Sequence, residues 1–126
     1  MQKRLLQFCI GVGGLVPVSA GLFGIIQGTA LLDVAPANAA LDSHFRYLSG
    51  LLLGIGLGFW STIFRLERSA TSLFVLTFVV VTGGLGRLAG MVGSGLPPAS
   101  MLAALVMELV VTPALFLWWR RLFEQR

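Results

Sequence analysis

The chain has 126 residues, of which 56% are hydrophobic and 11% are charged, and its mean hydropathy is +0.90. This composition is too apolar for a soluble domain of this size. The formal net charge of +4 could suggest a nucleic-acid partner, but the basic residues stand singly or in pairs at the ends of apolar segments. That placement is typical of membrane topology, so we expect an integral membrane protein and no nucleic-acid partner.

Four apolar segments are long enough to cross a bilayer, because a spanning helix needs about 20 residues. They cover about residues 5–31, 47–65, 70–92 and 99–119. The sequence therefore predicts an all-α integral membrane protein, a single four-helix transmembrane bundle over residues 1–126. The loop 32–46 is the only substantial polar segment, and a short turn or helix is expected to start there near Asp33 or Pro36.

The distribution of cations predicts the orientation. Seven of the nine Lys and Arg residues fall on one side if the four helices alternate: Lys3, Arg4, Arg65, Arg68, Arg120, Arg121 and Arg126. By the positive-inside rule, both termini and the turn at 65–70 face the cytoplasm, and the loops at 32–46 and 93–98 face outward.

The first apolar segment also has features of a signal peptide, with a basic start and a possible cleavage site at residues 18–20. The apolar run continues to Leu32, which is longer than the usual apolar core of a signal peptide, so we interpret it as the first span. Cys9 is the only cysteine, which excludes an internal disulfide and a cysteine metal cluster.

Small residues predict where helices pack closely. The first helix carries a stripe of Ala20, Gly24 and Gly28, and the second carries Gly50, Gly54 and Gly58, which lead up to Arg46. In the third helix, which Ser69 is expected to cap, Gly83, Gly84, Gly86 and Gly90 surround Arg87. Pro17 and Pro113 each remove a backbone hydrogen bond and predict an irregularity in the first and fourth helices.

Arg87 and Glu108 are the two charges within otherwise apolar segments, where an unpaired charge is costly. Both lie toward the outer ends of neighbouring helices, so the sequence predicts an ion pair between them, which Arg46 could join and above which Asp42 and His44 would sit. The simplest interpretation is a structural link between the third and fourth helices. The alternative is an anion clamp, in which two arginines and one glutamate bind a phosphate or carboxylate headgroup.

No catalytic, cofactor or metal motif accompanies these residues. His44 is the only histidine, so no second histidine completes a metal site or a proton relay. We expect no cofactor and no metal, and the sequence names no catalytic residue.

The segment Arg46 to Gly50, the sequence GGLGRL at 83–88, then Gly95, Pro97 and Glu108 occur in an order that resembles a known family. The chain is similar, over nearly its whole length, to small bacterial membrane proteins grouped as domain of unknown function 4345. The resemblance implies four transmembrane helices and a bacterial cytoplasmic membrane location. It implies no activity, substrate or catalytic residue.

Three kinds of function remain open. The sequence favours a non-enzymatic protein, either an accessory subunit of a membrane complex or a binder of lipid or another hydrophobic ligand, with membrane lipids, a larger complex or a homo-oligomer as partners. A second hypothesis is a dimeric proton-coupled transporter that uses Glu108. A third, ranked last, is an enzyme acting on a lipid or isoprenoid, since one carboxylate without an intramembrane histidine offers little acid–base chemistry.

Overall fold

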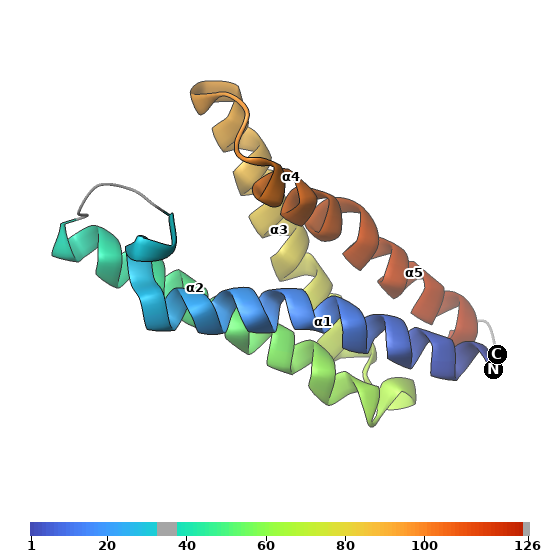
Figure 1. The fold of residues 1–126 in the computed structure, drawn as a ribbon. Coiled ribbons are helices and arrows are strands. Elements are labelled where there is room, and N and C mark those ends of the chain that lie inside the picture. Colours follow the sequence, from blue (N-terminus) through green and yellow to red (C-terminus); the bar gives the residue numbers. More distant parts are fainter. Residues whose placement is uncertain (33–37, 125–126) are drawn as a thin grey trace. The chain divides into compact units, whose positions relative to one another are not determined.

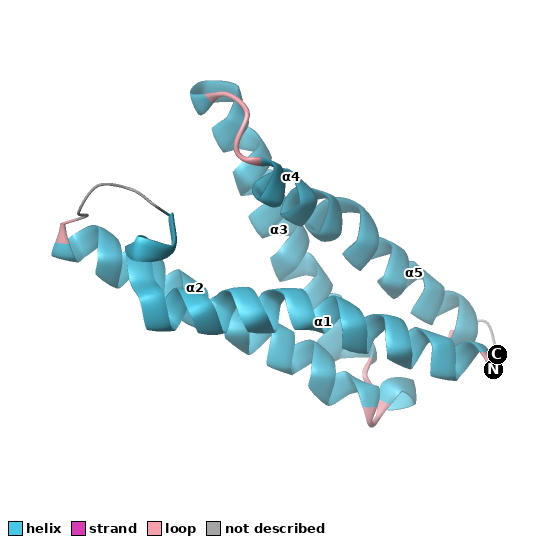
Figure 2. Ribbon diagram, viewed as in Figure 1, coloured by secondary structure: helices cyan, strands magenta, loops and turns pink. Residues whose placement is uncertain are grey.

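The structure is a computed structural model that describes residues 1–32 and 38–124. These residues form helices joined by short turns, with no strand among them (Figure 2). The longer helices are α1 (Gln2–Gln27), α2 (Ala39–Ile63), α3 (Ala70–Ser94), α4 (Ala99–Val106) and α5 (Thr112–Phe123). The shorter ones are two 3₁₀ helices, η1 (Gly28–Leu32) and η2 (Leu66–Arg68), and a π-helical turn, η3 (Met107–Val111).

The chain divides into two compact units (Figure 1). Phe8–Phe64 forms one, which we call the α1–α2 unit. Met1–Gln7 and the residues from Arg65 onward form the other, which we call the α3–α5 unit. The all-helical class is confirmed, whereas the single four-helix bundle and the cytoplasmic termini stay predictions.

Three helical stretches among the described residues are long and apolar enough to cross a membrane: Gln2–Leu32, Ala70–Ser94 and Ala99–Phe123. They correspond to three of the four predicted spans and indicate membrane association. The helix α2 is 25 residues long but is not among them. Its first turns carry Asp42, His44 and Arg46, and glycines dilute the apolar residues that follow. The fourth span therefore stays a prediction.

The helix α2 begins at Ala39, eight residues before the predicted start at 47. The reason is a capping residue that the sequence analysis passed over: the Asn38 side chain accepts a hydrogen bond from the Leu41 backbone N–H at 2.8 Å. An N-cap of this kind satisfies a helix donor that otherwise lacks a partner. Residues 39–46, predicted as part of the outer loop with room for a short helix, are the first turns of α2. The expected start near Asp33 or Pro36 lies outside the described residues.

Within the α1–α2 unit, the helices approach each other at glycines. The predicted stripe on α1 is used in part, because Gly24 lies against the Ser49 side chain and Gly28 against Asp42. The closest backbone approach is at Gly21, where a Cβ atom would lie 2.7 Å from the Ser49 carbonyl oxygen and 2.8 Å from the Leu53 Cα. Only glycine fits at that separation.

On the α2 side, the glycine at the contact is Gly56, where a Cβ atom would lie 3.0 Å from the Val18 backbone nitrogen. The glycines predicted to pack are its neighbours. A Cβ atom at Gly50 would lie 4.0 Å from Ile25 Cδ1, an ordinary van der Waals distance, and a Cβ atom at Gly54 would meet no described atom within 4 Å. The packing role predicted for Gly50, Gly54 and Gly58 stays a prediction.

In the α3–α5 unit, α3 starts after Ser69, but that side chain does not cap the helix as predicted. Its Oγ instead donates to the Arg65 carbonyl at 2.8 Å. The helix ends at Gly95, whose φ of +83° is accessible to glycine and strained for other residues, and whose N–H donates to the Met91 carbonyl at 3.0 Å. Pro97 and Pro98 follow, and the chain turns into α4.

The last helical stretch runs from α4 through η3 to α5. The irregularity predicted at Pro113 takes the form of the π-helical turn η3. Proline has no N–H to donate, and the Thr112 hydroxyl donates to the Met107 carbonyl at 2.8 Å. Such turns occur in helices where the regular hydrogen-bond ladder is interrupted, frequently at functional sites. This one contains Glu108.

Candidate functional site

The predicted ion pair between Arg87 and Glu108 is present in the α3–α5 unit. Nε of Arg87 donates to Oε2 of Glu108 at 3.1 Å, and Nη2 donates to Oε1 at 3.0 Å. This two-point geometry matches the planar fork of the guanidinium to the carboxylate. The Arg87 side chain is 34% exposed and that of Glu108 is 18% exposed. The pair is therefore largely sheltered within its unit, and the arginine is its more accessible member.

A glycine one turn before Arg87 allows the two backbones to come close enough for this pair. A Cβ atom at Gly84 would lie 3.0 Å from the Glu108 Cβ and 2.8 Å from Leu109 Cδ2. Gly84 is one of the four glycines expected around Arg87, and at the other three, Gly83, Gly86 and Gly90, a Cβ atom would meet no described atom within 4 Å. Their packing role stays a prediction, whereas Gly84 is the glycine that contacts the partner helix.

The guanidinium of Arg87 has unused donors. It carries five N–H groups, of which two are directed at Glu108. The described residues provide no partner for the others, which include both N–H groups of Nη1. The pair as a whole is electrically neutral, yet it presents an edge of hydrogen-bond donors beside an exposed face of α3. Such an edge can bind an acceptor, and in particular an anionic oxygen.

Arg46 and Asp42 form a separate cluster in the α1–α2 unit. Nε of Arg46 donates to Oδ2 of Asp42 at 2.7 Å, while Nη1 donates to the Ile25 carbonyl and, at 3.1 Å, to that of Ile26. Arg46 thus caps carbonyl groups at the C-terminal end of α1, where cations are favourable. A joint cluster of Arg46 with Arg87 would span the two units and stays a prediction, but most of the Arg46 donors are engaged within its own unit.

Asp42 also holds the turn that follows α1. Its Oδ1 accepts hydrogen bonds from the Thr29 backbone N–H at 2.9 Å and from the Thr29 hydroxyl at 3.2 Å. The hydrogen bond from Arg46 and those from Thr29 lower the pKa of the Asp42 carboxyl below its usual value of 3.8. We call Asp42, Arg46 and Thr29 the polar latch. Gly28, with φ of +60°, makes the turn that brings Thr29 to Asp42.

His44 contacts the ring of Tyr47, with ring centroids 6.4 Å apart. The described residues contain no group of three His, Cys, Asp or Glu side chains that could hold a metal ion. Within the described residues, His44 therefore belongs to no such group, and it is not part of the polar latch.

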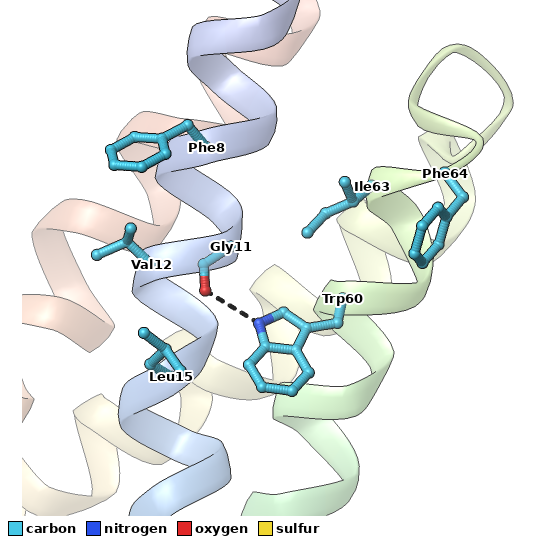
Figure 3. Close-up of a pocket in the computed structure, with 7 residues that line it drawn as sticks. All are labelled: Phe8, Gly11, Val12, Leu15, Trp60, Ile63 and Phe64. Carbon is cyan, nitrogen blue, oxygen red and sulfur yellow. Dashed lines mark hydrogen bonds between the residues drawn. The ribbon is translucent and has the colours of Figure 1, made fainter.

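An apolar groove of about 400 Å³ lies between α1 and α2 (Figure 3). Trp60 reaches across from α2 and donates its Nε1–H to the Gly11 carbonyl at 3.0 Å. The residues that line the groove are Phe8, Gly11, Val12, Leu15, Trp60, Ile63 and Phe64. The sequence does not predict this groove, because nothing in the spacing of these aromatic and aliphatic residues distinguishes them from lipid-facing ones.

A family model described as Domain of unknown function (DUF4345) matches residues 5–119. The match includes both members of the Arg87–Glu108 pair and the polar latch. No curated protein and no solved structure matches the chain.

Proposed function

The chain belongs to the DUF4345 family, as its sequence motifs predicted, and from this premise we propose that it is a non-enzymatic membrane protein that binds an anionic amphiphile, such as a lipid, at Arg87. It would reside in the bacterial cytoplasmic membrane as a four-helix protein with both termini in the cytoplasm. The family description assigns no activity, so the proposal depends on the chemistry of the site.

The observation that carries the proposal is that only some of the Arg87 donors have a partner. Two of its N–H groups donate to Glu108, and the rest have no described partner although the side chain is one-third exposed. An arginine whose guanidinium donates to a carboxylate along one edge can donate to a phosphate or carboxylate along the other edge. The surrounding α3 is apolar enough to span a membrane, which suits a ligand that carries an acyl or isoprenoid chain.

The same geometry disfavours the alternatives that use Glu108 chemically. Both carboxylate oxygens of Glu108 already accept hydrogen bonds from the Arg87 guanidinium, so the carboxylate has a fixed structural partner. A proton-coupled transporter would need Glu108 to exchange protons, and an enzyme would need it as an acid or a base. The transporter remains the runner-up, because an intramembrane carboxylate is a functional candidate by default.

The test compares two substitutions that change the charge of the site in opposite directions. The full chain is purified in mild detergent and analysed by native mass spectrometry with co-purified lipid retained. Arg87→Gln should carry one bound anionic molecule fewer than the wild type, whereas Glu108→Gln should retain more, because the arginine is no longer neutralised. Unchanged occupancy in both variants, at equal monodispersity, would refute binding at Arg87.

A second candidate function is that of an accessory subunit in a membrane complex. It is favoured by the face of α3 formed by Gly83, Gly86 and Gly90, where added Cβ atoms would meet no described atom within 4 Å. In membranes, faces of small residues let another helix approach closely. The same mass spectra distinguish this candidate, because an accessory subunit leaves the membrane with other proteins attached.

The proposed orientation rests on the cations at the segment ends. Fusing a reporter that is active only outside the cytoplasm to each end, and to the turn at Arg65, gives a direct test. All three fusions should be inactive. An active C-terminal fusion together with an inactive N-terminal fusion would mean an odd number of spans, and two active terminal fusions would mean the opposite orientation.

A further inference from the structure

One end of the α3–α5 unit gathers cations from three segments of the chain. These segments are the start of α1, the turn that contains η2, and the last turns of α5. The exposed cations there are Lys3, Arg4, Arg65, Arg68, Arg120 and Arg121, which we call the cationic end.

Specific contacts hold the three segments together. Nζ of Lys3 forms a salt bridge with Oε1 of Glu67 at 2.7 Å, and Nε1 of Trp119 donates to the Leu66 carbonyl at 2.7 Å. Each segment also buries one apolar side chain almost fully: Leu6, Leu66 and Trp119 are 0%, 1% and 2% exposed. In Figure 1, the start of α1 lies at the same end of the unit as the C-terminal end of α5. The cations therefore share one surface.

The carboxylates at this surface are already neutralised. Glu67 is paired with Lys3, and Glu124 is paired with Arg120 at 2.5 Å. The hydrogen bond and charge of Lys3, together with the charge of Arg68, lower the pKa of the Glu67 carboxyl. Arg4, Arg65, Arg68 and Arg121 have no salt bridge or side-chain hydrogen bond to any described residue. Four exposed guanidinium groups are left to bind anions.

The position of this surface indicates the kind of anion. The three helical stretches that could span a membrane start or end here, at Gln2, Ala70 and Phe123. If they are inserted, as proposed above, the four arginines lie at the level of the lipid headgroups. On α5, the Trp119 ring stacks with Phe116 at a centroid distance of 6.1 Å and meets the Phe123 ring in a tilted arrangement at 5.8 Å. Aromatic residues of this kind favour the membrane interface.

We propose that the cationic end is a binding surface for anionic phospholipids, whose phosphates are contacted by Arg4, Arg65, Arg68 and Arg121. Guanidinium groups bind phosphate oxygens with two parallel hydrogen bonds, and clustered cations next to spanning helices attract anionic headgroups. The inference rests on the proposed membrane insertion but not on a ligand at Arg87. This surface and Arg87 can therefore bind or fail to bind lipid independently.

The experiment titrates delipidated, detergent-solubilised full chain with single phospholipids and counts bound molecules by native mass spectrometry. Phosphatidylglycerol and cardiolipin should bind at least ten-fold more tightly than phosphatidylcholine. The triple variant Arg65→Gln, Arg68→Gln, Arg121→Gln should lose this preference, and Arg87→Gln should keep it. A triple variant that retains the preference, or equal binding of all three lipids, would overturn the proposal.

Two further samples separate charge from misfolding and lipid from other anions. Replacing the same three arginines with lysine keeps the charge and should restore most of the preference. Recovery in the lysine variant would show that the glutamine variant loses the preference because it loses charge. Inorganic phosphate at the lipid concentration should not compete. Full competition by phosphate, or by a poly-glutamate peptide, would identify the surface as a site for soluble anions or acidic proteins and refute the lipid assignment.

Discussion

The guanidinium of Arg87 binds both carboxylate oxygens of Glu108, and it does so across a helix contact that the absence of a side chain at Gly84 makes possible. The two charges cancel within one helix pair. Either charge alone would be costly in an apolar environment, where insertion scales give about 2.5 to 3.5 kcal/mol for a charged residue at a helix centre.

The first prediction concerns the coupling between these two residues. Arg87→Gln and Glu108→Gln should each lower the free energy of unfolding by about 2 to 3 kcal/mol, because each leaves a sheltered charge without its partner. The double variant should be less destabilised than the sum by at least about 1 kcal/mol. Denaturant unfolding of the wild type, the two single variants and the double variant in one detergent measures the four free energies of this double-mutant cycle. Strict additivity would show that the pair contributes no coupling.

The second prediction compares two adjacent glycines of α3. Gly84→Ala should destabilise the protein by about 1 to 3 kcal/mol, because the new Cβ would lie within 3.0 Å of Glu108 and Leu109. Gly83→Ala is the matched control, since its Cβ would meet no described atom within 4 Å. Alanine is also more favourable than glycine within a helix by up to about 1 kcal/mol, so Gly83→Ala should be as stable as the wild type or more stable. Equal melting temperatures for the two variants would contradict the helix contact at Gly84.

The sequence predicted the apolar helices and the charged pair because both depend on strong, local signals. Long apolar runs specify spanning helices, and two charges in such runs must find each other or another partner. The boundaries of α3 and of the last helical stretch were also close to those predicted, since Pro97 and Pro98 interrupt the chain between them.

The details that sequence reasoning missed depend on three-dimensional register. On α2 the close contact is at Gly56 and not at Gly50 or Gly54, and of the four glycines expected around Arg87 it is Gly84 that lies against the partner helix. Which glycine faces a partner depends on the rotation of each helix, and a sequence with many glycines does not define that rotation. The capping role of Asn38 was overlooked because Asp33 and Pro36 offered competing start signals in the same polar segment.

The third prediction concerns the polar latch and pH. The folded-state pKa of Asp42 is lowered, so its stabilising contribution is complete above its usual value of 3.8 and is lost as the pH falls through the lower, folded-state value. Asp42→Asn should therefore be less stable than the wild type near neutral pH. The difference should shrink only below about pH 3.8. Thermal unfolding of both proteins from pH 7 to pH 2.5 measures it. A difference that stays constant to the lowest pH would show that the ionised carboxylate is not what holds Arg46 and Thr29.

The fourth prediction compares two adjacent tryptophans of α5. Trp119 is 2% exposed and donates to the Leu66 carbonyl, whereas Trp118 is only partly buried and has no hydrogen bond to a described side chain or backbone group. Trp119→Phe removes a buried donor and part of the packing, which should lower the free energy of unfolding by about 1 to 3 kcal/mol. Trp118→Phe should change it by less than about 0.5 kcal/mol.

The Trp119 contact joins α5 to the turn before α3, so its loss should also loosen the cationic end. Hydrogen exchange should become faster in residues 65–69 of Trp119→Phe and remain unchanged there in Trp118→Phe. Equal exchange in the two variants would show that the turn is held without Trp119. In that case the salt bridge between Lys3 and Glu67 is another contact that ties the turn to the rest of the cationic end, and Lys3→Gln should then produce the faster exchange.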